Sequence, residues 1–84
     1  METRVALIGI VVEKLESVEA LNHILHQYGS YIIGRMGLPY QKRNVSIISV
    51  AVDAPGDVIS ALSGKLGMLP GVSSKTIYSK FPSD

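Results

Sequence analysis

The chain has 84 residues, of which 46% are hydrophobic and 18% are charged. This length fits one small domain, and the charged share is below the roughly 25% of an average globular protein, so part of the surface is expected to be covered. Eight Lys and Arg residues against seven Asp and Glu residues give a net charge of +1, which is not the strongly basic balance of a nucleic-acid-binding protein. With no cysteine, the chain has no disulfide, thiolate metal ligand or cysteine nucleophile. The apolar run at residues 5–12 is too short to cross a bilayer, and we expect a cytoplasmic protein that does not contact a membrane.

The first predicted element is a strand at residues 4–13, RVALIGIVVE. Both alternating sets of its side chains are apolar, which is typical of a central strand covered on both faces. A helix is predicted at residues 17–28, where apolar residues recur at helical spacing. Ser17 is its predicted N-cap and Gly29 its predicted left-handed C-cap.

Two further strands are predicted at residues 30–36 and 45–53. The segment GRMGLPYQK at residues 34–42 overlaps the end of the first of these strands. It is predicted to form the hairpin connection to the next strand, because two glycines and a proline suit a turn. A second helix is predicted to open at Pro55 and to end near Gly67. The last predicted strand, at residues 72–78, is polar enough for a sheet edge.

The resulting order, β-α-β-β-α-β in one domain, predicts an α+β fold of the ferredoxin-like type. In this sandwich a four-stranded antiparallel sheet carries two helices on one face. The other face would receive apolar side chains from the first strand and the small residues Ser49 and Ala51 from the third. A bare apolar face on a lightly charged chain predicts a homo-oligomer, dimer or tetramer, that assembles through sheet surfaces.

One candidate site is a metal site on the first predicted helix. His23 and His26 lie three residues apart, and Glu19 precedes His23 by one turn. Together they offer three ligands to zinc or nickel, for which imidazole is a suitable donor. The alternative is a solvated polar helix face, since both histidines fall opposite the apolar stripe.

Catalytic patterns are missing from the sequence. The serines lie in no GxSxG elbow, and the histidines are expected on the face of a helix opposite its apolar stripe. No two carboxylates are paired for general acid–base catalysis. We therefore expect no catalytic residue, no enzymatic activity and no cofactor.

The second candidate site lies in GRMGLPYQK. This segment lacks the GxGxxG and GxxxxGK[ST] spacings and opens no helix, so it is not a phosphate loop. Arg35 has no role in a hairpin turn, and we expect it to point to the sheet face where subunits meet and to hold a carboxylate or phosphate, beside the backbone of Gly34 and Gly37. The alternatives are a solvated arginine and an ion pair between subunits.

The element order, with GRMGLPYQKRNVSIISVAVDAP in the middle and LSGKLGMLPGVSSK near the end, resembles a small stand-alone family of regulators of the iron-only hydrogenase system. The resemblance runs from RVALIGIVVE to VSSKTIYSK. It implies a single ACT-like domain over residues 1–84, with an ordered core at about 3–80, related in fold to the C-terminal domain of the nickel-responsive repressor.

The resemblance also implies a non-enzymatic regulatory or sensor module that binds a small-molecule effector, or a protein partner in hydrogenase regulation or maturation. That repressor holds nickel with histidines and a cysteine on and near a strand, whereas the strand VSIISVAV has neither, so nickel sensing is not expected to carry over. The repressor's ribbon-helix-helix arm is missing as well, so no direct nucleic-acid contact is expected. The remaining alternative is a purely structural interaction protein without an effector.

Overall fold

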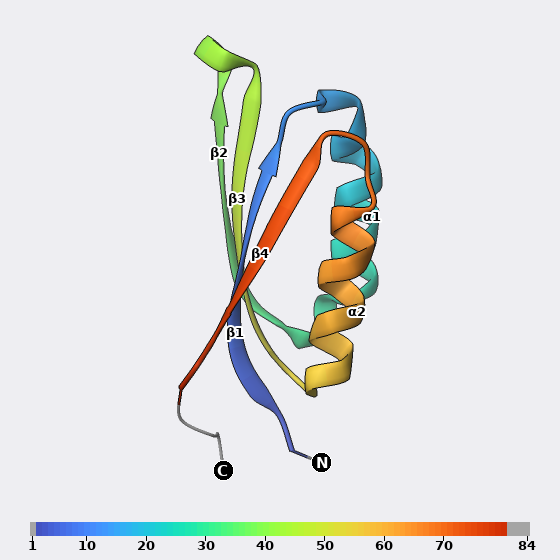
Figure 1. The fold of residues 1–84 in the computed structure, drawn as a ribbon, viewed down its shortest axis with the longest axis vertical. Coiled ribbons are helices and arrows are strands. Elements are labelled where there is room, and N and C mark those ends of the chain that lie inside the picture. The colour runs from blue at the N-terminus through green and yellow to red at the C-terminus, as the bar shows by residue number, and fades with distance from the viewer. Residues whose placement is uncertain (1, 81–84) are drawn as a thin grey trace.

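β1 lies in the interior of a four-stranded antiparallel sheet with the strand order β2-β3-β1-β4. The computed structural model describes residues 2–80. The strands are β1 (Arg4–Val12), β2 (Ile32–Tyr40), β3 (Val45–Ala54) and β4 (Val72–Tyr78), and the α-helices are α1 (Val18–Gln27) and α2 (Gly56–Gly67). Both helices lie on one side of the sheet (Figure 1). The predicted ferredoxin-like α+β sandwich is confirmed, and β4 lies at a sheet edge as expected.

The core lies between the sheet and the helices. Alternate residues of β1, namely Ala6, Ile8, Ile10 and Val12, are buried, because side chains along a strand point to opposite faces. In register with them, Val50 and Ile48 of β3 pair with Ile8 and Ile10 and are buried too. The helices contribute the other half of this layer with Leu21, Leu25, Ile59, Leu62 and Leu66. Burial of each such side chain contributes about 1.5–3 kcal/mol, which is what holds the two layers together.

The sheet surface that faces away from the helices is called the outer face below. Leu7 of β1 points to it and lies between Ala51 of β3 and Ile77 of β4. Gly9 lies between Ser49 and Lys75 in the same way. The predicted placement of the first-strand residues and of Ser49 and Ala51 on this face is therefore confirmed.

The prediction of a hairpin turn at residues 34–42 was wrong. β2 continues through this segment to Tyr40, and the turn lies at residues 41–44, where Asn44 adopts the left-handed conformation with φ 54° and ψ 42°. Its N–H donates to the carbonyl of Gln41 at 3.2 Å. β2 is an edge strand, and an edge tolerates Pro39 and the glycines because only one side of the strand is hydrogen-bonded within the sheet.

Of the two predicted caps of α1, the position of the N-cap is confirmed and the C-cap is wrong. Ser17 stands at the N-cap position, but its hydroxyl makes no capping bond and instead donates to the carbonyl of Pro70 at 2.6 Å. The residue is buried, and this bond ties the start of α1 to the turn before β4. Gly29 is no left-handed cap, because the chain continues into a 3-10 turn at Gly29–Tyr31. Within residues 2–80, no helix is long and apolar enough to cross a membrane.

Candidate functional site

Arg35 lies in the middle of β2 and points to the helix side of the sheet. Its register partner is Val50, a buried residue of the core layer, and its Nη2 donates to Oδ1 of Asn22 on α1 at 3.0 Å. The prediction that Arg35 points to the outer face was wrong, because the strand continues through this segment and its side chains alternate between the two faces. Asn22 was not predicted from the sequence, which holds no signal for its pairing with Arg35.

The three residues proposed for effector binding do not converge on one face. Gly34 is in register with Ala51 and belongs to the outer face, whereas Arg35 and Gly37 belong to the helix side. A Cβ placed on Gly34 or on Gly37 would meet no atom within 4 Å, so both faces of β2 are open here. Among residues 2–80, Arg35 forms no ion pair with a carboxylate, and its exposed guanidinium keeps donors available for an anion.

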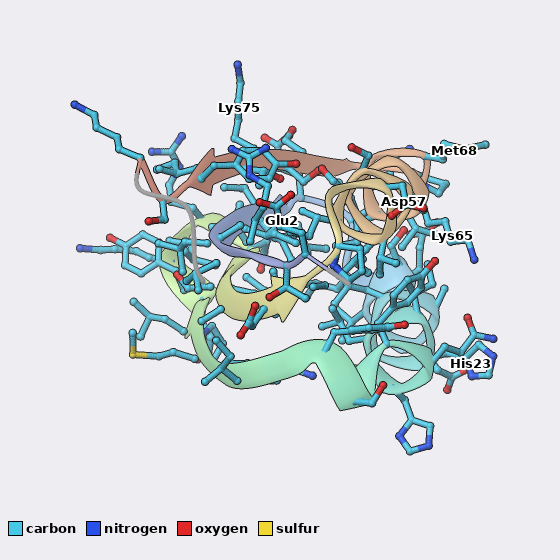
Figure 2. The ribbon with its side chains drawn as sticks, turned by 90° about the horizontal axis from the view of Figure 1, so that it is seen from below. Glu2, His23, Asp57, Lys65, Met68 and Lys75 are labelled. Carbon is cyan, nitrogen blue, oxygen red and sulfur yellow. The ribbon has the colours of Figure 1, made fainter. Side chains whose placement is uncertain are left out.

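The polar face of α1 carries Glu19, His23 and His26, and all three are exposed. Figure 2 shows His23 on the side of α1 that faces away from the sheet. Its Nε2 lies 3.5 Å from Nε2 of Gln27, one turn further along the helix. In the part of the chain that the structure describes, no group of three His, Asp or Glu side chains is placed to hold a metal ion. The metal site at these residues stays a prediction.

The outer face has two shallow hollows beside β2. One, of about 240 Å³, lies where Gly34, Ser49 and Ala51 leave space between larger side chains, and the other, of about 260 Å³, lies beside Gly37. Met36 and Leu38 border these hollows and are exposed. Sequence analysis missed both residues as parts of a surface because it ended the strand at Met36 and assigned Leu38 to a turn.

A further pocket, of about 420 Å³, lies between the start of α1 and the end of the β2–β3 hairpin. Leu15, in the 3-10 turn Leu15–Ser17 before α1, and Val18, the first residue of α1, line it on one side, and Pro39, Tyr40 and Val45 line it from the hairpin. None of its lining residues is charged. Its chemistry suits an apolar group better than an anion.

Together, the open edge strand, the apolar outer face and the two helices on one side define a small α+β domain of the ferredoxin-like, ACT-like class. The chain belongs to the TM1266-like family, described as "Iron-only hydrogenase system regulator, putative", whose model matches residues 4–76. The family resemblance stated from the sequence is confirmed.

The structure of protein TM1266 from Thermotoga maritima is similar over 94% of this chain and 100% of that one, with 36% identity and a TM-score of 0.90. The C-terminal domain of the MgtC protein from Mycobacterium tuberculosis matches 98% of this chain and 94% of its own, with 12% identity and a TM-score of 0.71. A formyltetrahydrofolate deformylase from Pseudomonas putida matches 88% of this chain but 28% of its own, with 14% identity and a TM-score of 0.58. The last two likenesses concern the fold alone. A comparison with curated proteins finds no match.

Proposed function

We propose that this chain is a non-enzymatic regulatory module of the iron-only hydrogenase system. It acts as a homo-oligomer and responds to a small-molecule effector or to a protein partner. The observation that carries this proposal is the extent of the family match, which covers residues 4–76 and hence every helix and strand except the last two residues of β4. The regulatory role described for the family is therefore assigned to this domain itself.

The outer face supports assembly with a second copy. Val5, Leu7 and Val11 of β1 and Ile47 of β3 are exposed there although all four are large and apolar. Four strands about 4.8 Å apart, each about nine residues long, present a face on the order of 600 Å². This approaches the roughly 800 Å² that each partner contributes to a standard interface. A second copy is a suitable cover for an apolar surface of this size.

Arg35 is the contact that we propose for the effector. The guanidinium binds a carboxylate or phosphate with two parallel hydrogen bonds, and Asn22 orients it from α1 without neutralising its charge. An anionic metabolite is therefore the class of effector that fits this position.

The effector proposal is tested with purified protein and a panel of carboxylate and phosphate metabolites. We expect at least one compound to raise the melting temperature of the wild type, since a ligand that binds only the folded state stabilises it. Calorimetry of that compound should show at least tenfold weaker binding to Arg35→Ala and unchanged binding to Lys42→Ala, which removes an exposed cation from the turn instead. Equal binding to both variants would contradict the role of Arg35.

The regulatory proposal is tested in the cell that encodes the protein. Deletion of the gene should change hydrogenase expression or activity, and the wild-type gene should restore it. Unchanged hydrogenase output in the deletion strain, under conditions that induce the enzyme, would contradict the regulatory function whatever the outcome of the effector panel.

A further inference from the structure

The pocket between the start of α1 and the β2–β3 hairpin arises because the strands end at different levels. β1 ends at Val12, which pairs with Ser46, whereas β2 and β3 continue to the pair Tyr40 and Val45 and to the turn after it. The end of the hairpin therefore extends past the ends of β1 and β4 (Figure 1). Between this end and the start of α1 lies the pocket of about 420 Å³.

Ser46 leaves part of this space open. Its partner Val12 is buried on the helix side, and directly opposite residues of an antiparallel pair share a face, so Ser46 points to the helix side as well. The next residues of β3 on this side, Ile48 and Val50, are large, apolar and buried. A serine at the end of this series leaves a hollow that a larger apolar side chain would close.

The walls of the pocket are apolar and partly flat. Leu15 is 55% exposed, so much of its side chain is available to cover a ligand, and Val18 lies beside it at the first position of α1. On the hairpin side, Pro39 and Tyr40 each contribute a ring. Aromatic rings stack on planar molecules in an offset or tilted arrangement, and this interaction adds to the burial of apolar area.

The polar groups of the pocket are all neutral. The side chains of Gln41, Asn44 and Ser46 line it, and within residues 2–80 none of them forms a hydrogen bond. A side-chain amide offers both donors and an acceptor, so it pairs with another amide-like group on both counts. A charged ligand would lose its hydration here without meeting an opposite charge, which is unfavourable.

We propose that this pocket binds a small neutral molecule that has a planar ring and an amide-like edge. The ring lies between the α1 side, with Leu15, and the hairpin side, with Tyr40, and its polar edge meets the amides of Gln41 and Asn44. The volume of about 420 Å³ is at the low end of the roughly 300–1,000 Å³ of ligand pockets, so a molecule of one or two rings fits.

This site is separate from the one proposed for an anion. Arg35 is not among the lining residues of the pocket, and the two sites require opposite chemistry, a charged ligand at Arg35 and a neutral one here. The inference therefore goes beyond the proposed function and does not depend on it.

The first test compares three probe molecules by NMR titration of the ¹⁵N-labelled full chain. Benzamide has a planar ring and a neutral amide, benzoate has the same ring with a negative charge, and cyclohexanecarboxamide has the same amide on a ring that is not planar. We expect benzamide to cause saturable shifts in the amides of Leu15, Val18 and residues 41–46. Benzoate and cyclohexanecarboxamide should each bind there about tenfold more weakly or less, because one brings a charge and the other lacks the planar ring.

Each other result of the titration counts against the proposal. No saturable shift with benzamide at these residues would overturn the site. Benzoate that binds there as tightly as benzamide would overturn the neutral ligand, and cyclohexanecarboxamide that binds equally well would overturn the planar ring.

The second test closes the pocket with Ser46→Leu, and Ser60→Leu on the exposed side of α2 is the matched control. Leucine at position 46 continues the apolar series of β3, so the variant should fold and melt no lower than the wild type. We expect Ser46→Leu to weaken benzamide binding about tenfold or more, since the added side chain occupies the space of the ligand, and Ser60→Leu to leave it unchanged.

A folded Ser46→Leu variant that binds benzamide like the wild type would overturn the site. If circular dichroism shows that this variant is unfolded, Tyr40→Leu and Tyr40→Phe decide instead. Leucine removes the aromatic ring and should weaken binding, whereas phenylalanine keeps the ring and should preserve it. Equal binding to these two variants would overturn the stacking on Tyr40. None of these failures affects the regulatory module of the proposed function, which makes no use of this pocket.

Discussion

The backbone at Gly71 runs against the start of the loop that follows β1. Gly71 has φ 70°, and a Cβ there would lie 2.6 Å from Cγ and 2.9 Å from the backbone nitrogen of Lys14. Its carbonyl also accepts a hydrogen bond from the N–H of Glu13 at 2.7 Å, so neither segment can move away freely. We expect Gly71→Ala to lower the free energy of unfolding by about 1–3 kcal/mol, measured by urea denaturation.

Gly64 is the matched control for that substitution. It lies inside α2, and a Cβ there meets no atom within 4 Å. Because alanine favours the helix over glycine by up to about 1 kcal/mol, Gly64→Ala should raise the free energy of unfolding. Equal effects of the two substitutions would contradict the close approach at Gly71.

Among the secondary-structure elements, β2 shows where sequence reasoning fails. The segment GRMGLPY was assigned to a turn because glycine and proline are common in turns, yet its residues alternate in kind. Met36 and Leu38 are on the outer face, whereas Arg35, Gly37 and Pro39 are on the helix side. This alternation of period two was available in the sequence and would have indicated that the strand continues to Tyr40, although it does not tell which set of side chains faces the helices. That the strand lies at an edge, where its proline is tolerated, follows only from the full strand order.

The true turn of the β2–β3 hairpin depends on Asn44. Within residues 2–80, Asn44 is the only residue other than glycine with a positive φ. Asparagine tolerates this conformation better than most residues. We expect Asn44→Gly to keep the stability of the wild type and Asn44→Val to lower it by about 1–2 kcal/mol, because a branched Cβ clashes in the left-handed region. Thermal and urea unfolding of the two variants measure this difference. Equal stability of both variants would show that the turn does not require the left-handed residue.

For the whole molecule, the two-layer architecture was predictable and the surfaces were only partly so. The apolar residues on both faces of β1 predicted a central strand with one face on the helices and one left bare, and the structure has this arrangement. Helical periodicity likewise identified the buried residues Leu21 and Leu25. The Arg35–Asn22 bond and the hollow beside Gly34 could not be predicted, since both depend on how β2 lies beside α1 and β3.

The outer face of the sheet is the surface through which we propose that two copies assemble. Two outer faces that stack about a two-fold axis give an assembly of two copies with closed symmetry. Leu7, on the interior strand β1, is 44% exposed at the centre of this surface. We expect Leu7→Glu to halve the mass of the wild-type assembly, because an unpaired buried carboxylate costs several kcal/mol at an interface.

Light scattering measures the mass, and Ser60→Glu, on the exposed side of α2, is the control that should leave it unchanged. Because Leu7 points away from the helices, circular dichroism and urea unfolding of Leu7→Glu should remain close to the wild type. A Leu7→Glu protein with the full wild-type mass would show that the outer face is not an interface.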